Sequence, residues 1–223
     1  FNKLRKVLEP EISAWLGAAA PICAAVSISI SIALSPWFSW THNALSDLGV
    51  SEVAPIFNSG LILTGILISI FAISFAGVEC DSRLCFAGAN GLFVMGVSIV
   101  GVGVFTEAFM LMHILFALAC FISLTLSSIL IGVHFIKDRE NRLLGVFALP
   151  AGILSVIVWF AINMPGIAIK EALSASPAFV WFIALAMDFE GSGLQNNVKC
   201  KLTPLEKLQI TQAKIEGAIY DGV

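Results

Sequence analysis

The chain alternates long apolar stretches with short polar segments, and six such apolar stretches occur before residue 190. Each holds about 20 residues, the length that a helix needs to cross roughly 30 Å of bilayer hydrocarbon. The pattern therefore predicts an all-α membrane protein, a bundle of six transmembrane helices. The predicted spans cover residues 12–34, 56–78, 85–105, 109–135, 144–164 and 168–187.

The pattern changes after the sixth span. A polar segment that begins at Gly191 predicts a linker. Thr203-Pro204-Leu205-Glu206 then has the features of a helix start, with threonine as N-cap, proline first and glutamate third. Apolar residues at helical spacing follow, which predicts an amphipathic tail helix that lies on the membrane or docks on a partner, such as another membrane subunit. We therefore divide the chain into a membrane domain, residues 1–190, and a linker with a tail helix, residues 191–223.

Composition agrees with a membrane protein, since 58% of the residues are hydrophobic and 12% are charged. Soluble domains carry roughly 25% charged residues, and the mean hydropathy of +0.96 excludes an ordinary soluble fold. The net charge of −3 is small and the basic residues are scattered through loops, so we expect no nucleic-acid partner. The expected location is the plasma membrane, with several passes.

The basic residues set the expected orientation. Eleven of the twelve Lys and Arg residues fall in alternate polar segments, and only Lys170 falls on the other side. Cytoplasmic segments of membrane proteins collect Lys and Arg, so both termini and the tail helix are predicted to be cytoplasmic. The eleven residues are Lys3, Arg5, Lys6, Arg83, Lys137, Arg139, Arg142, Lys199, Lys201, Lys207 and Lys214.

Three segments on the predicted outer side resemble segments of a known protein family. They are Asn43-Ala44-Leu45-Ser46-Asp47-Leu48-Gly49 with Phe57-Asn58-Ser59-Gly60-Leu61, Gly103-Val104-Phe105-Thr106-Glu107 leading to His113, and Gly166-Ile167-Ala168-Ile169-Lys170-Glu171-Ala172 leading to Trp181. With these residues, residues 15–187 resemble an uncharacterised family of six-span prokaryotic membrane proteins, many of them archaeal, described as a domain of unknown function. The resemblance implies a six-helix bundle and no established activity. The layout is also loosely similar to DRAM-like and Sfk-like membrane proteins.

Polar residues from several segments converge at the predicted outer surface. Ionisable groups near or inside membrane spans usually face a cavity or a partner, so we predict a shallow polar pocket that faces outward. Lys170 would pair with a carboxylate there. The candidate ligand-binding residues are His42, Asn43, Ser46, Asp47, Asn58, Glu107, His113, Lys170 and Glu171.

Three interpretations of this pocket remain open. In the first, Asn43, Ser46 and Asp47 brace the outer loop through local hydrogen bonds, and His113 and Glu107 satisfy each other or the backbone. In the second, the same pocket binds a lipid headgroup or a small solute. The third is catalysis with a metal that activates water.

Catalysis would use both outer histidines, His42 and His113, with one of Asp47, Glu107 or Glu171. Zinc in catalytic sites takes three protein ligands and keeps one open position. The ligand spacings typical of such sites, for example two histidines four residues apart on one helix, are absent from the chain. The candidate catalytic residues of this hydrolase hypothesis are His42, Asp47, Glu107 and His113.

A second group lies on the predicted cytoplasmic side. Cys80, Cys85, His134 and Cys200 have the ligand types of a Cys₃His zinc site, but the spacing is loose and two of them are remote in sequence. We interpret Cys80 and Cys85 as reduced loop thiols, because cytoplasmic cysteines rarely pair outside hyperthermophiles. No cofactor is predicted.

These observations favour a non-catalytic membrane protein that binds a membrane lipid or small ligand in an outer pocket, or an accessory subunit of a larger complex. A metal-assisted intramembrane hydrolase is the alternative. A small transporter is less favoured, because the spans show neither an inverted repeat nor a row of charges.

Overall fold

The computed structural model describes residues 9–80, 82–137, 142–160 and 164–201, the last range without side chains from residue 192 on. Within these ranges the chain is helical and has no strand. The predicted tail helix and the basic residues Lys3, Arg5, Lys6, Arg139, Lys207 and Lys214 lie outside them. The elements are α1 (Pro10–Ala33), η2 (Leu45–Val50), α2 (Ala54–Val78), α3 (Arg83–Val104), η3 (Glu107–Phe109), α4 (Met110–Lys137), α5 (Arg142–Phe160) and α6 (Ile167–Lys201).

The six predicted spans are confirmed as six helices that are long and apolar enough to cross a membrane. Most boundaries differ from the predicted ones by a few residues, but the last helix differs more. α6 continues to Lys201, so the domain boundary expected at residue 190 falls inside a helix. Each glycine in the Gly191-Ser192-Gly193 segment costs a helix about 1 kcal/mol, yet extending a helix that already exists needs no new nucleation.

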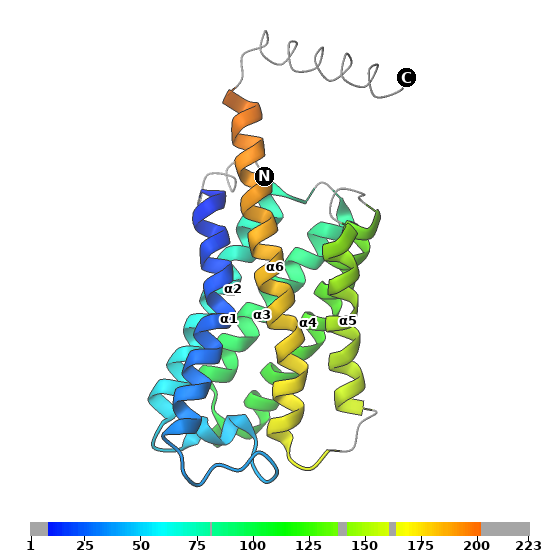
Figure 1. The fold of residues 1–223 in the computed structure, drawn as a ribbon. Helices are drawn as coiled ribbons and strands as arrows, with labels where there is room; N and C mark the ends of the chain where they lie inside the picture. The colour runs from blue at the N-terminus through cyan, green and yellow to red at the C-terminus, as the bar shows by residue number, and fades with distance from the viewer. Residues whose placement is uncertain (1–8, 81, 138–141, 161–163, 202–223) are drawn as a thin grey trace.

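The helices form a closed ring (Figure 1). Each helix packs against its neighbours in sequence, and α6 closes the ring by packing against α1. The glycine-rich α3 is one member of the ring, between α2 and α4. Its glycines allow close approach on both sides, since Gly96 faces Gly65 of α2 and Gly88 faces Ile131 of α4. Small residues at such contacts are the usual means of packing helices in lipid.

One half of the ring is filled by aromatic side chains. Phe71 of α2 lies with its ring centroid 5.2 Å from that of Phe182 and 5.6 Å from that of Phe189, both on α6. Phe75 and Trp181 are also fully buried in this cluster. The aromatic residues therefore plug the ring at the end where α6 extends beyond the bundle.

The opposite end carries the loop with η2, the turn with η3 and the start of α6 (Figure 1). We call it the outer end, after the orientation that the basic residues predict. Among described side chains, Arg83, Lys137 and Arg142 lie at the other end and Lys170 lies here. The η2 loop docks on α6, because the Ala168 N–H donates to the carbonyl of Asn43 at 3.0 Å.

The turn between α2 and α3 corrects one sequence-based interpretation. Cys80 and Cys85 form a disulfide, where reduced thiols were expected. Their Cα atoms are 5.1 Å apart, within the usual range for bonded pairs, and the Ser82 hydroxyl caps α3 by accepting from the Cys85 N–H. The expectation was based on the reducing conditions of the cytoplasm. These conditions do not determine how closely a tight turn holds two thiols.

The orientation is testable by surface labelling. In intact cells, a membrane-impermeant thiol reagent is expected to modify His42→Cys, which is exposed in the η2 loop, and to spare Glu11→Cys, which is exposed at the opposite end of α1. Both variants carry Cys200→Ser, so that the engineered thiol gives the signal. After permeabilisation, Glu11→Cys is expected to react as fully as His42→Cys. Labelling of Glu11→Cys alone in intact cells would reverse the orientation.

Candidate functional site

A cavity of about 180 Å³ lies inside the ring, between the aromatic plug and the η2 loop. Side chains from α1, α2, α3, α4 and α6 form its walls, and Leu45 and Ser46 of η2 cover its outer end. The same helices that make the ring therefore enclose a space in its outer half.

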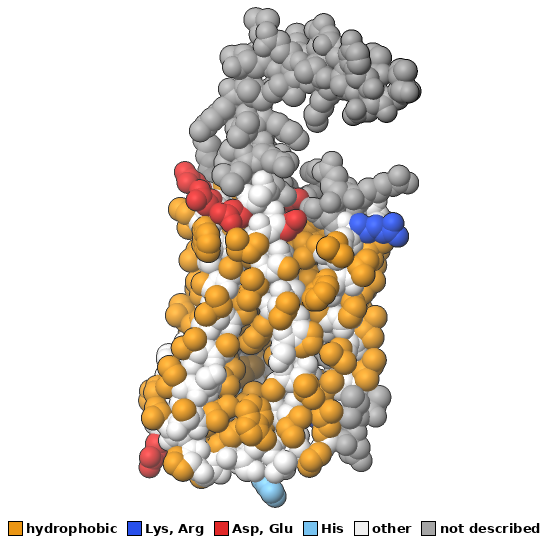
Figure 2. Space-filling view, viewed as in Figure 1, with side chains coloured by type: hydrophobic (Ala, Val, Ile, Leu, Met, Phe, Trp, Pro, Cys, Tyr) orange, Lys and Arg blue, Asp and Glu red, His pale blue; other side chains and the backbone are white. Residues whose placement is uncertain are grey.

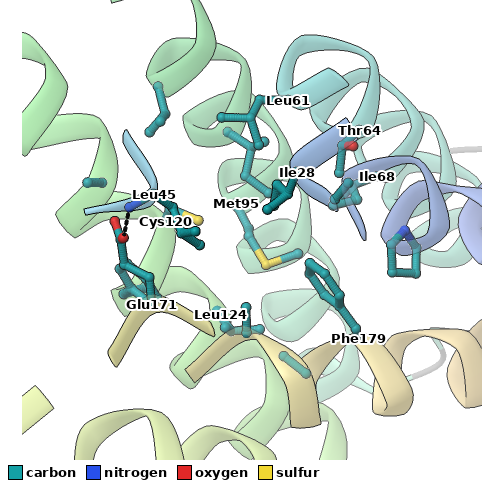
Figure 3. Close-up of a pocket in the computed structure, with 18 of the residues that line it drawn as sticks. Ile28, Leu45, Leu61, Thr64, Ile68, Met95, Cys120, Leu124, Glu171 and Phe179 are labelled. Atoms are coloured by element: carbon teal, nitrogen blue, oxygen red, sulfur yellow. Dashed lines mark hydrogen bonds between the residues drawn. The ribbon is translucent and has the colours of Figure 1, made fainter. Parts of the chain in front are cut away.

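The walls of the cavity are almost entirely apolar. Met95 of α3, Leu124 of α4 and Phe179 of α6 point toward the open space, with Ile28 of α1 and Leu61 of α2 across from them (Figure 3). Such a surface gives no hydrogen bonds to water, and an apolar cavity of this kind stays dry or takes up an apolar group. The cavity therefore favours hydrocarbon over a hydrated solute.

Polar side chains gather at one end of the cavity. Ser46, His113 and Glu171 line it beneath the η2 loop, while Thr64 and Cys120 lie deeper. The Thr64 hydroxyl already donates to the carbonyl of Gly60 at 2.7 Å. No lysine or arginine is among the described residues that line the cavity. The site thus combines an apolar chamber with a polar outer end that carries a carboxylate and no cation.

Glu171 connects α6 to the η2 loop. Its Oε2 accepts a hydrogen bond of 2.6 Å from the Leu45 N–H, at the start of η2 (Figure 3). Within the described part of the chain, no residue bonds its second oxygen, Oε1. Asp47 and Glu107 lie close enough to act on Glu171 electrostatically. Three carboxyl groups therefore lie at or near the outer end of the cavity.

The neighbouring carboxylates hold the loop. Glu107 accepts a hydrogen bond of 2.6 Å from the Ser46 hydroxyl. Asp47 accepts from the Asn43 amide at 2.7 Å and from the Ala44 N–H at 3.1 Å. The bracing role that the sequence suggested for Asn43, Ser46 and Asp47 is thus present, and with Glu171 these bonds fix η2 over the cavity.

His113 has one ring nitrogen committed to the backbone. Its Nδ1 lies 2.8 Å from the carbonyl oxygen of Phe105. A carbonyl oxygen only accepts, so Nδ1 carries the proton and Nε2 of the neutral ring is an acceptor. No bond to Nε2 occurs among the described residues, and the histidine is buried at the cavity wall. Both His113 and Glu171 therefore bring an unused acceptor to this end.

The remaining predicted site residues lie outside the cavity. His42 is exposed at the loop tip, where its Nδ1 contacts the hydroxyls of Ser39 and Thr41. The Asn58 amide donates to the Gly49 carbonyl at 2.9 Å. Lys170 is partly buried beside Glu171, and the pairing expected for it is not found, since no ion pair of Lys170 occurs within the described residues. Ser46, His113 and Glu171 are the predicted site residues that line the cavity.

Neither candidate metal site is assembled. Across the described residues, no group of three or more His, Cys, Asp or Glu side chains is placed to hold a metal ion. On the other side of the bundle the Cys80–Cys85 disulfide removes two thiolate ligands, and His134 contacts the Ser82 hydroxyl at 3.1 Å. The side chain of Cys200 lies outside the described residues. The geometry therefore gives no support to the hydrolase hypothesis.

Sequence reasoning missed most of the cavity wall. Met95, Ile99, Phe121 and Phe179 line the cavity, yet each looks like any other apolar residue of a membrane span. Cys120, which has a free thiol, also lines the cavity. A cavity inside a ring of apolar helices depends on packing between helices, and hydropathy does not report packing.

Comparison with known proteins gives a family and no activity. Residues 18–188 match the model of the family described as "Protein of unknown function (DUF998)". No curated protein and no solved structure matches the chain, so the looser similarity to DRAM-like proteins has no support. The matched region begins inside α1 and ends inside α6, so it covers the whole ring and the cavity.

Proposed function

We propose a function from the premise that this chain belongs to the DUF998 family of proteins of unknown function: it binds, without chemical conversion, a small amphipathic molecule in the cavity of the ring. The apolar part of the ligand occupies the chamber and its polar head lies under η2. The observation that carries the proposal is the cavity itself, apolar along its walls and polar at its outer end.

The volume of the cavity limits the size of the apolar part of the ligand that the ring can enclose. The cavity measures about 180 Å³, and an apolar protein cavity on the order of 150 Å³ is known to hold benzene. A group of roughly six carbon atoms therefore fits. Burial of apolar surface contributes about 25 cal/mol per Å², so even a short chain gains useful affinity when it leaves water.

The polar end selects the head group. Glu171 Oε1 and His113 Nε2 are acceptors, and the described residues of the lining include no lysine or arginine to balance an anion. An anionic head would lie beside Glu171 and near the acidic side chains of Glu107 and Asp47, with no described lysine or arginine in the lining to balance its charge. A hydroxyl, amine or ammonium group offers hydrogens to both acceptors. We therefore expect alcohols and amines to bind and carboxylates to be rejected.

The proposal places the protein in the plasma membrane with the outer end away from the cytoplasm. This orientation follows the basic residues, which favour the cytoplasmic side. Binding by an accessory subunit of a larger complex is compatible with the same site, because the cavity lies inside the ring and leaves its outer surface to partners or lipid.

Titration calorimetry with protein in lipid nanodiscs tests the proposal. Hexylamine and 1-hexanol are expected to bind saturably after subtraction of empty nanodiscs, and hexanoate is not. Glu171→Gln keeps an acceptor but removes the carboxylate, so hexylamine affinity is expected to fall at least tenfold, a change of about 1.4 kcal/mol. Hexanol affinity is expected to change less, because a neutral donor depends less on charge.

Two matched controls accompany this measurement. Glu52→Gln makes the same substitution at an exposed position of the outer end, outside the cavity, and is expected to leave both affinities unchanged. Ala117→Phe fills the cavity from α4, whereas Leu118→Phe changes the neighbouring exposed position. If hexylamine bound equally to wild type, Glu171→Gln and Ala117→Phe, the proposed site would be wrong.

A further inference from the structure

The cavity has a side opening toward the membrane. In the space-filling view a hollow lies between α1 and α6 in the outer half of the bundle, and hydrophobic side chains line its interior (Figure 2). The same two helices diverge toward the outer end (Figure 1). Three cavity residues of these helices, Ile28, Ala175 and Phe179, are only partly buried. Protein atoms therefore do not fully cover these cavity residues.

Close packing limits the opening on two sides, toward the aromatic plug and toward the outer end. Toward the aromatic plug, Gly17 of α1 lies against Phe71 and Ala186, so α1 and α6 meet closely there. At the outer end, Leu45 and Leu48 of η2 pack with Ala168 of α6. Between these contacts both helices contribute small side chains to the cavity lining, Ala24 from α1 and Ala175 from α6. The opening is thus a window in the wall of the ring.

The window lies at a depth that suits a lipid. Glu171 is the fifth residue of α6 and His113 the fourth of α4, so both lie within about 8 Å of the outer helix ends at 1.5 Å per residue. This is the level of lipid head groups and of the first carbons of their chains. A chain that reaches the middle of a bilayer covers about 15 Å of hydrocarbon, more than a benzene-sized cavity encloses.

We infer that the occupant is a membrane lipid with an alcohol or amine head and no phosphate next to it, which enters sideways from the outer leaflet. Its head lies at Glu171 and His113, its first carbons fill the cavity, and the rest of its chain leaves between α1 and α6 into the bilayer. This inference rests on the proposed function and adds the class of ligand and its route. A phospholipid would place an anionic phosphate beside Glu171 and near Asp47 and Glu107, and no lysine or arginine is among the described residues that line the cavity.

The test compares a long ligand with a short one in the same nanodiscs. Dodecylamine and 1-dodecanol are expected to bind at least as tightly as their six-carbon counterparts, because a chain that leaves through the window does not have to fit inside the cavity, and dodecyl phosphate is not expected to bind. Ala175→Phe places a large ring in the window, and Ala184→Phe makes the same change at an exposed position of α6 outside the cavity. Dodecylamine affinity is expected to fall at least tenfold in Ala175→Phe and to stay unchanged in Ala184→Phe. Thermal melting of both variants confirms that they fold.

A photoreactive dodecanol with a diazirine at its far end locates the chain. Cross-links mapped by mass spectrometry are expected on the outward-facing residues of α1 and α6, and not on α3. If hexylamine binds but dodecylamine does not, or if Ala175→Phe has no effect, the lipid and its route are wrong while the proposed function stands. If neither amine binds to wild type, both proposals fail. Binding of dodecyl phosphate as tight as that of the amine would overturn the head-group assignment.

Discussion

Replacing Gly65 with alanine is expected to destabilise the ring by about 1–3 kcal/mol, the usual cost of overpacking a well-packed interface. A Cβ atom at this position of α2 would overlap the carbonyl oxygen of Gly96 and would lie 2.8 Å from the backbone nitrogen of Val100, both on α3. Backbone atoms inside a helix cannot rotate away as a side chain can. The two helices would have to separate.

Separation matters more here than in a soluble protein. Helices in lipid gain little from burying apolar surface against each other, because lipid tails are as apolar as the helices, so close packing supplies much of their association. The contact is also reciprocal, since a Cβ at Gly96 would lie 2.7 Å from the Gly65 carbonyl oxygen. α2 and α3 together carry seven of the residues that line the cavity, from Phe57 to Val102, so their separation would also distort the site. We therefore expect weaker hexylamine binding in Gly65→Ala.

Gly77→Ala is the matched control, because it makes the same change in the same helix where a Cβ would meet no atom within 4 Å. Its melting temperature is expected to stay level or rise slightly, since alanine favours a helix over glycine by up to about 1 kcal/mol. Gly65→Ala is expected to melt about 2–4 °C lower for each kcal/mol lost. Equal melting temperatures for the two variants would contradict the close α2–α3 contact.

The spans and their number could be predicted from the sequence because hydropathy and helix length are local properties. Their packing is not local. The ring depends on the contact between α1 and α6, the first and the last helix of the membrane domain in sequence. No residue pattern in either helix predicts this contact. The cavity follows from the ring, so Met95 and Phe179 could not be told from ordinary apolar residues.

The polar end was partly predictable for a physical reason. A carboxylate or histidine near a membrane span needs a partner or a cavity, and this reasoning predicts His113 and Glu171 correctly as site residues that line the cavity. It also included His42 and Asp47, which lie in the same loop but contact neighbours there. Position along the chain could place residues at the outer surface, but it could not decide which of them turn inward.

The second large effect is expected at Gly166, between α5 and α6. Its φ of 84° lies in the left-handed region, which costs a non-glycine residue about 1–2 kcal/mol. A Cβ there would overlap the carbonyl oxygen of Trp40 and approach the Cα of Thr41 at 2.8 Å. Gly166→Ala therefore strains its own backbone and pushes the η2 loop away from α6.

The consequence should be local, and it should appear at the cover of the cavity. Two hydrogen bonds join the loop to α6 close to this glycine, Ala168 N–H to Asn43 and Leu45 N–H to Glu171. If the loop moves, these amides lose their acceptors and exchange with solvent faster. Hydrogen–deuterium exchange of the Ala44–Val50 segment is expected to accelerate at least tenfold in Gly166→Ala, about 1.4 kcal/mol of lost protection.

Gly191→Ala separates this effect from a general response to alanine in α6, because a Cβ there meets nothing within 4 Å and no strained φ is involved. Its exchange profile is expected to match wild type. The aromatic plug around Phe71 should keep its protection in both variants, since it lies in the other half of the ring. Because η2 covers the polar end of the cavity, Gly166→Ala should also weaken hexylamine binding about tenfold. Unchanged exchange at Leu45 together with weaker binding would mean that Gly166 acts on the site by some route other than the η2 loop.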